Sequence, residues 1–261
     1  MVIPSIGNYT IRVFSSVLDF LRLVSETLFL LARQTVKFRL RGKEIIEQLF
    51  CIGVQSLPVV GFSLLFITLM LLTEFSFHVK LVLRQDSLVP AFSTVLMIRE
   101  LGPVITSLLL ASRVGAAIAA EVGTMKITEQ LDALKLLAIH PIEFLVLPRW
   151  IACIVGTVSL SLIALGIGVG GGALMASGLL GSSKEQFLNT MFVFVRYSDI
   201  WGCVIKAAVF GSLIPLIASW HGFHCRFGSQ GVGNAATAAV VHSSVLIIVA
   251  DFVLTYLLYA V

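Results

Sequence analysis

The sequence predicts an all-α integral membrane protein, and three observations support that class. Of its 261 residues, 58% are hydrophobic and only 12% are charged, whereas soluble domains are about 45–50% apolar and about 25% charged. The mean hydropathy is +1.02. Several uncharged runs reach the length of about 20 residues that a helix needs to cross a bilayer. The net charge of +4 is small and the basic residues are scattered along the chain, so the composition does not indicate a nucleic-acid-binding protein.

The N-terminal segment, residues 1–44, carries a narrow charged stripe. At about 100° per residue, the polar side chains of residues 8–38 fall on one side of a helix; they are Arg12, Ser15, Asp19, Arg22, Glu26, Arg33 and Lys37. Most of the remaining surface is Val, Leu, Ile and Phe. A helix of this kind suits the membrane interface, so we expect it to lie along the membrane. The alternative, a first spanning helix, would bury six charged residues at a high energetic cost.

Five apolar runs follow. The predicted spans are residues 49–72, 88–112, 151–180, 200–220 and 237–261, and residues 187–195 can extend the fourth span outward. Lysine and arginine favour the cytoplasmic side of membrane proteins. Residues 1–48, 113–149 and 221–236 hold twelve of them, and residues 73–87 and 181–199 hold four. The N-terminus is therefore expected in the cytoplasm and the C-terminus outside.

Small residues recur four positions apart, a spacing that lets helix backbones approach closely. The sets are Ser112, Ala116 and Ala120; Gly115, Ala119 and Gly123; Gly166 and Gly170; and Gly168 and Gly172. We interpret them as packing positions, either inside the chain or across a dimer.

The connection between the second and third spans contains the sequence TEQLDALKLLAIHP. Its apolar residues have helical spacing, Thr128 is a possible N-cap, and Glu129 and Asp132 suit the positive end of a helix dipole. Pro141 ends the pattern. We predict a short helix at about residues 124–140, which either docks on a soluble partner or serves as a solvated linker.

Four charged residues fall inside the apolar runs: Arg99, Glu100, Lys206 and Asp251. A charge at the bilayer centre costs about 3 kcal/mol or more, so each should face a partner or a cavity. Arg99 and Glu100 lie about 100° apart on their helix and cannot point the same way. Pro103 removes the hydrogen bond that the Arg99 carbonyl would accept. Both a structural ion-pair network and a charged cavity that binds a ligand fit these residues.

Other chemical motifs are weak. There is no G-x-x-x-x-G-K-[ST] motif, so this chain lacks the phosphate-binding loop of an ATPase. His221, His224 and Cys225 have a spacing that suggests a metal, but a polar turn explains them better. We expect neither catalytic residues nor a metal site in this chain.

Two blocks carry a resemblance to a known family. The sequences RELGPVITSLLLASRVGAAIAAEVGTMKITEQLDALKLLAIHP (99–141) and VVHSSVLIIVADFVLT (240–255) resemble MlaE-type permeases. These are the membrane subunits of ABC transporters that move phospholipids between bacterial membranes, with relatives in plastid envelopes. The resemblance covers about residues 45–261. Asn234 departs from it, since relatives often have arginine there, and the first span lacks the family's usual glycines.

The resemblance implies a homodimer in which each chain has an interfacial N-terminal helix (1–44) and a permease domain (45–261) with five spans. It implies a cytoplasmic coupling helix that seats on a separate ATP-binding subunit, with Glu129, Gln130, Leu131, Asp132 and Leu134 as its contact residues. ATP and Mg would belong to that subunit, and this chain would need no cofactor. An MCE-type lipid-binding subunit would lie on the outer side.

The same resemblance places the protein in the bacterial inner membrane, with the plastid inner envelope as the alternative. On this reading Arg99, Glu100, Lys206 and Asp251 surround a lipid-accessible cavity near the dimer axis. The alternative function is an ion- or proton-coupled secondary transporter, in which Glu100 and Asp251 relay protons. Such transporters usually contain an internal repeat, and none is visible in this sequence.

Overall fold

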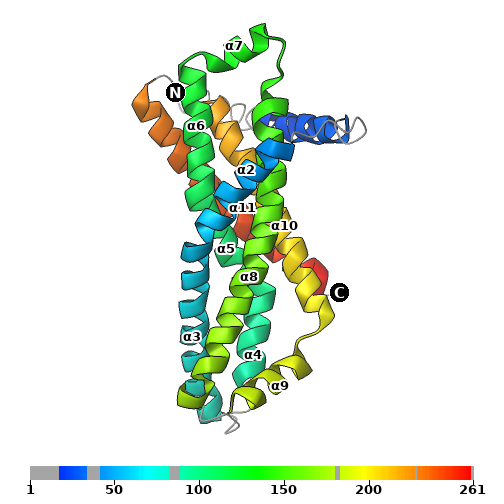
Figure 1. Ribbon diagram of the computed structural model, residues 1–261, viewed down its shortest axis with the longest axis vertical. Coiled ribbons are helices and arrows are strands. Elements are labelled where there is room, and N and C mark those ends of the chain that lie inside the picture. Colours follow the sequence, from blue (N-terminus) through cyan, green and yellow to red (C-terminus); the bar gives the residue numbers. More distant parts are fainter. Residues whose placement is uncertain (1–17, 34–41, 83–88, 180–182, 227, 260–261) are drawn as a thin grey trace, which may run out of the picture.

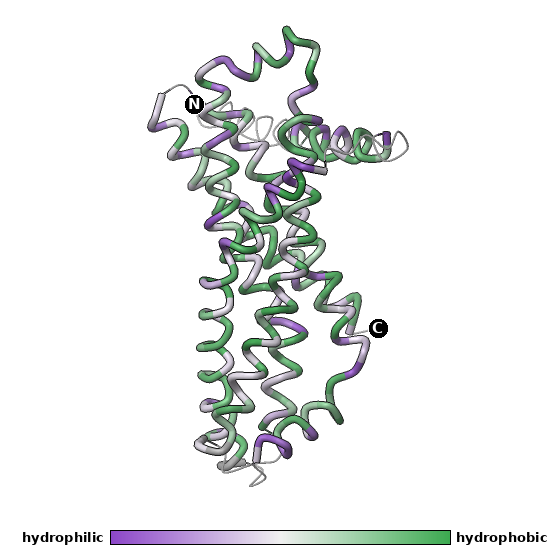
Figure 2. Tube along the Cα trace, viewed as in Figure 1, coloured by the Kyte–Doolittle hydropathy of each residue, from purple (hydrophilic) through white to green (hydrophobic). Residues whose placement is uncertain are grey.

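The computed structural model describes residues 18–33, 42–82, 89–179, 183–226 and 228–259. Within these ranges the chain is helical, with short connections and no strand. Five helical stretches are long and apolar enough to cross a membrane: Gly42–Val79, Val89–Ile127, Ile142–Ala176, Tyr197–Phe223 and Ser229–Tyr259. The predicted all-α membrane class and the number of spans are therefore confirmed. The stretches form an elongated bundle (Figure 1), and apolar residues dominate along most of its length (Figure 2).

The first two spans are interrupted helices. Span one consists of α2 (Gly42–Ile52), the 3₁₀ turn η1 (Val54–Ser56) and α3 (Leu57–Val82). Span two consists of α4 (Val89–Leu96), the π-helical η3 (Met97–Leu101), α5 (Gly102–Leu110), the π-helical η4 (Ala111–Gly115) and α6 (Ala116–Ile127). It continues well past the predicted end at residue 112, because the Ala-rich sequence after Arg113 favours helix although it is no longer free of charge.

The remaining elements follow in chain order: α7 (Gln130–Leu136), η5 (Ile142–Val146), α8 (Leu147–Leu179), α9 (Lys184–Phe194), α10 (Tyr197–Phe223) and α11 (Ser229–Tyr259). In Figure 1, α7 lies at one end of the bundle and α9 near the other. The suggestion that residues 187–195 extend the fourth span is wrong. They belong to α9, and Val195 and Arg196 are extended residues that separate it from α10.

The N-terminal helix, residues 18–33, lies across the long axis of the bundle at the α7 end (Figure 1). Leu23 packs against Val146 and Leu216 of the bundle, while Leu21 and Phe29 are exposed. Its apolar surface is thus divided between a face bound to the protein and a face free for lipid. This orientation suits the predicted interfacial position. Arg12, Ser15 and Lys37 of the predicted stripe lie outside the described residues.

The glycines of α8 divide into two groups. A Cβ at Gly168 would lie 2.6 Å from the Thr68 hydroxyl oxygen, and one at Gly172 would lie 3.0 Å from Leu72. These two glycines let α8 pack closely on α3. Gly166 and Gly170 have no neighbour within 4 Å of such a Cβ, so they form no close packing contact within the described chain.

Close packing between α8 and α10 makes Gly211 sensitive to substitution. A Cβ there would lie 2.9 Å from the Cys153 carbonyl oxygen and 2.8 Å from the Thr157 hydroxyl oxygen. We expect Gly211→Ala to destabilise the fold by about 1–3 kcal/mol, because the backbone carbonyl cannot move aside easily. Gly166→Ala is the matched control and should be neutral or slightly stabilising. Thermal unfolding in one detergent would measure both, and equal melting temperatures would contradict the prediction.

Candidate functional site

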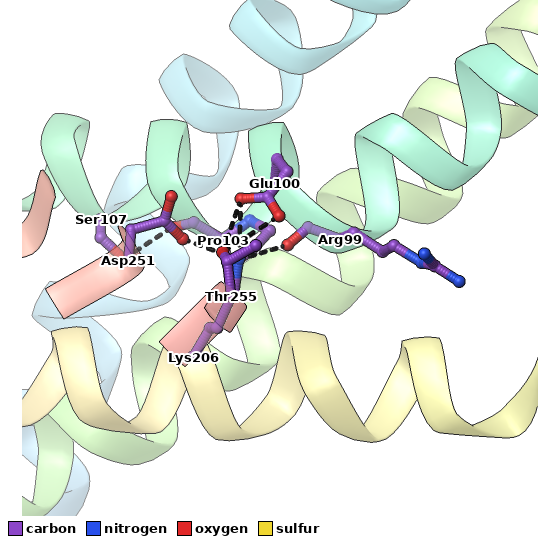
Figure 3. A network of polar contacts seen from close by, with 7 residues as sticks. All are labelled: Arg99, Glu100, Pro103, Ser107, Lys206, Asp251 and Thr255. Atoms are coloured by element: carbon purple, nitrogen blue, oxygen red, sulfur yellow. Dashed lines mark hydrogen bonds and ion pairs between the residues drawn. The ribbon is translucent and has the colours of Figure 1, made fainter. Parts of the chain in front are cut away.

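Three of the four predicted intramembrane charges, Glu100, Lys206 and Asp251, meet at Lys206, and Arg99 joins them through its backbone carbonyl (Figure 3). The Lys206 side chain is fully buried. Its ammonium donates hydrogen bonds to the Arg99 carbonyl oxygen (2.8 Å), to Glu100 Oε2 (2.8 Å) and to Thr255 Oγ1 (2.6 Å). Because an ammonium has one donor for each of these acceptors, Lys206 has no hydrogen left for a ligand.

The two carboxylates bind this lysine differently. Glu100 accepts hydrogen bonds from both Lys206 and the Thr255 hydroxyl, whose oxygen lies 3.1 Å from Oε1 and 3.2 Å from Oε2. Asp251 Oδ1 lies 2.8 Å from the Lys206 nitrogen, yet its geometry does not make a hydrogen bond. Asp251 therefore contributes an ion pair in addition to the three hydrogen bonds of Lys206. Spans two, four and five are joined at this single nitrogen.

Backbone chemistry around Pro103 creates the third acceptor. Pro103 has no N–H to donate to the Arg99 carbonyl, and Lys206 occupies that oxygen instead. The residues just before it are π-helical, with the Gly102 N–H bonded to the Met97 carbonyl. A Cβ at Gly102 would lie 2.8 Å from that carbonyl oxygen and 2.7 Å from Leu165, so this turn requires glycine. π-Helical turns often occur at functional sites.

Arg99 points away from Glu100, as their helical angle predicted. Its Nε donates to Asp199 Oδ1 at 2.8 Å, and its guanidinium carbon lies 4.6 Å from the centre of the Tyr259 ring. Asp199 is fully buried and also accepts the Arg196 backbone N–H at the start of α10. With Asp199 included, three carboxylates face two cations, so the formal sum is −1 and not zero as the four predicted residues suggested.

Asp199, Thr255 and Tyr259 are the cluster residues that the sequence reading missed. Asp199 belonged to a predicted connection, where a carboxylate is unremarkable, and Thr255 and Tyr259 are ordinary residues of an apolar helix. One signal was available: Thr255 and Tyr259 follow Asp251 at spacings of four, so all three share a helix face.

The predicted helix at 124–140 is shorter than expected. It is divided at Thr128 and Glu129, and α7 covers only Gln130–Leu136. Thr128 does not cap α7: its hydroxyl donates back to the Thr124 carbonyl, and Glu129 occupies the N-cap in a left-handed conformation with φ 58°. Ala138 beyond the other end has φ 56°. Non-glycine residues seldom adopt such angles, so two unfavourable residues bracket α7.

The side chains of α7 separate into a packed side and a free side. Leu131 is buried and Leu134 is half-buried, whereas Gln130 and Asp132 are exposed. Leu136 and Leu137 are 90% and 70% exposed. Asp132 accepts a hydrogen bond from Lys135 at 2.8 Å, which holds the pKa of its carboxyl below the ordinary value. Asp132 is therefore ionised at neutral pH and presents its charge beside the exposed leucines.

Two further polar contacts connect elements near α7. The nearly buried Arg149 of α8 donates to Glu121 of α6 at 2.6 Å, and His140 lies 3.0 Å from Glu26 of the N-terminal helix. His221 of the suggested metal motif instead stacks on His242 of α11, with ring centres 4.8 Å apart. In the part of the chain that the structure describes, no three metal-binding side chains come together.

Five apolar helices long enough to cross a membrane, joined by buried charges, define a polytopic membrane protein. The family model "Permease MlaE" matches residues 45–257, and the chain belongs to the MlaE permease family.

Relatives extend over nearly the whole chain. A probable ABC transporter permease protein of Rickettsia typhi is 38% identical over 98% of this chain and 97% of its own length. The intermembrane phospholipid transport system permease protein MlaE of Haemophilus influenzae is 32% identical over 97% of this chain and 98% of its own. The chloroplastic protein TRIGALACTOSYLDIACYLGLYCEROL 1 of Arabidopsis thaliana is 41% identical over 60% of this chain and 45% of its own.

Proposed function

We propose that this permease moves phospholipids between membranes as part of an ABC transporter whose ATP is hydrolysed, with Mg, on a separate subunit. The observation that carries the proposal is α7, which holds Leu136 and Leu137 outside the bundle between two strained residues. Apolar side chains exposed in this way mark an interaction site. A secondary transporter has no need of such a docking helix, so the structure favours ATP coupling over proton coupling.

Within the charge cluster, Arg99 is the residue suited to meet lipid phosphate. Its side chain is 34% exposed, and only its Nε is bound by Asp199, which leaves the forked end of the guanidinium free for an anion. Lys206, by contrast, has used all its donors on the protein. We therefore assign Lys206, Glu100 and Asp251 to holding the spans together, and Arg99 to the lipid.

The exposure of the same cluster supports the proposal that the protein is a homodimer. The side chains of Arg99, Glu100 and Asp251 are 34%, 26% and 20% exposed, and charged groups at this depth cannot face lipid tails. The surface of α11 that surrounds Asp251 is mostly apolar and exposed, including Ile248 and Phe252. A second copy packed along α11 would enclose the charged groups in a shared cavity open to lipid.

The positive-inside rule orients this assembly. Residues 1–48, 113–149 and 221–236 hold twelve lysines and arginines against four in the other two connections. The N-terminus and α7 therefore face the cytoplasm, where the ATPase is, and the C-terminus faces the periplasm of a bacterial inner membrane. An MCE-type lipid-binding subunit on that outer face would receive or deliver the lipid.

Reconstitution tests the proposal directly. The chain is placed in vesicles with its co-purifying subunits, and the transfer of fluorescent phospholipid to acceptor vesicles is followed with and without ATP. Transfer should require ATP and persist when proton-gradient uncouplers are added. In vesicles that hydrolyse external ATP, protease added outside should cleave the connection that contains α7, residues 128–141. Transfer without ATP that stops with an uncoupler would establish the secondary transporter instead.

A further inference from the structure

Another cation within the spans, Arg113, lies away from the charge cluster. Arg113 belongs to the π-helical turn η4 of span two and is exposed. Its Nη1 donates to the Ser56 hydroxyl at 2.7 Å, and its Nη2 lies 3.4 Å from the Gln55 side-chain oxygen. Both partners are neutral. Among the described residues, no carboxylate lies within ion-pair distance of Arg113, whereas Arg99, Arg149 and Lys206 each have one.

The position of Arg113 along the bundle is that of a membrane edge. It directly follows the uncharged end of the run 101–112. Its partners lie in η1, where span one changes from α2, with Lys43, Glu44 and Glu47, to the apolar start of α3. Arg113 is thus the first charge after the uncharged run of span two, and its partners lie where the apolar helix α3 begins. Arg113 lies about 21 Å along its helix from Arg99, at about 1.5 Å per residue, so the two cations cannot bind one headgroup.

The surface next to Arg113 matches an amphiphile. Ser56 is buried and holds the guanidinium in place, while Val54 and Val59 on either side of it are 54% and 52% exposed. A guanidinium has several N–H donors in a fixed fork that fits a phosphate, and only two of its nitrogens are engaged here. A guanidinium held by Ser56 offers a contact for a phosphate, and the exposed valines near Ser56 in the sequence offer one for acyl chains.

We infer that Arg113, positioned by Ser56 and Gln55, binds the phosphate of a phospholipid at the kink between α2 and α3. This site is separate from the charge cluster and lies at the membrane edge nearer α7. It deepens the proposed function by locating where a phospholipid of the adjacent leaflet meets the permease. The apolar valines favour a lipid over free phosphate, which has no acyl chain to contact them.

The test uses the full chain in nanodiscs of phosphatidylethanolamine and phosphatidylglycerol, with a photo-crosslinking amino acid in place of Val54. Tracer phosphatidylglycerol and tracer diacylglycerol with the same acyl chains compete for the label. The unsubstituted Arg113 should favour the phospholipid, and Arg113→Gln should reduce that preference about tenfold, since a charged hydrogen bond is lost. A crosslinker in place of Phe66, exposed further along α3, is the control and should show no change.

Unchanged preference at position 54 in Arg113→Gln would overturn the inference. Displacement of the lipid label by millimolar inorganic phosphate would also overturn it, because the site would then recognise the soluble anion. If Arg113→Gln does not fold, Arg113→Lys replaces it. Lysine keeps the charge but lacks the forked guanidinium that can contact Ser56, Gln55 and a phosphate together. We therefore expect Arg113→Lys to reduce the preference for the phospholipid, and an unchanged preference would contradict the inference. The assay measures binding without ATP, so its result is independent of whether ATP drives transport.

Discussion

Replacing Lys206 with methionine is expected to destabilise the permease more than any other single substitution in the spans. The change removes the one cation that Glu100 and Asp251 share and leaves the Arg99 carbonyl without its donor. Breaking a buried pair by removing one partner costs about 3–5 kcal/mol. The purified variant should therefore show a large loss of folded material in size-exclusion chromatography and a strongly lowered melting temperature.

The control removes the stranded charges as well. In Lys206→Met combined with Glu100→Gln and Asp251→Asn, no unpaired charge remains, and replacing a whole buried ionic group is often close to neutral. Folding should recover substantially, and lipid transport should recover with it, because Arg99 is the residue assigned to the lipid. A well-folded triple variant without transport would show that Lys206, Glu100 or Asp251 acts on the lipid directly.

A charge swap, Lys206→Asp combined with Asp251→Lys, would not distinguish a structural role of the pair from a role in lipid binding. Lys206 contacts the Arg99 carbonyl oxygen and Glu100 in addition to Asp251. An aspartate in its place would face another carboxylate and a carbonyl oxygen. The swap would thus fail for structural reasons alone, whatever the cluster does for lipid.

Replacing Leu136 and Leu137 together with serine is expected to abolish association with the ATPase while the chain stays folded. Both side chains are largely exposed and support no packing within the described chain. At an interface, truncating a well-buried anchor costs about 2 kcal/mol or more, which is about thirtyfold in affinity for each such residue. Co-purification of the ATPase and its ATP hydrolysis rate would measure the loss.

A matched apolar pair at the other end of the bundle is the control. Phe192 and Val193 of α9 are 70% and 78% exposed. Their replacement with serine should leave the ATPase bound, since α9 lies near the end of the bundle opposite α7 (Figure 1). If the Leu136 and Leu137 variant still co-purified with the ATPase at the unsubstituted level, α7 would be only a linker.

The charge cluster shows which site residues a sequence pattern can predict and which it cannot. The sequence identified four of its members because a charge inside an apolar run is conspicuous by itself. The sequence pattern did not indicate Asp199, because this residue lies where α9 ends and α10 begins. Carboxylates are common in such connections. Its role appears only when span two places Arg99 against it. The length of α7 was misjudged for a related reason, since the break at Glu129 is a left-handed turn that a leucine pattern does not reveal.

The sequence by itself determined the class, the five spans, the divergence of Arg99 and Glu100 and the carbonyl freed by Pro103, because each depends on local composition, helical period or the chemistry of one residue. The tertiary structure alone decided which charges pair, that Lys206 is saturated while Arg99 and Arg113 retain free donors, and which glycines of α8 pack on α3. Those outcomes depend on which helices pack together and on how far each is shifted along the bundle axis. The sequence pattern of one helix contains no information about its neighbours or about that shift.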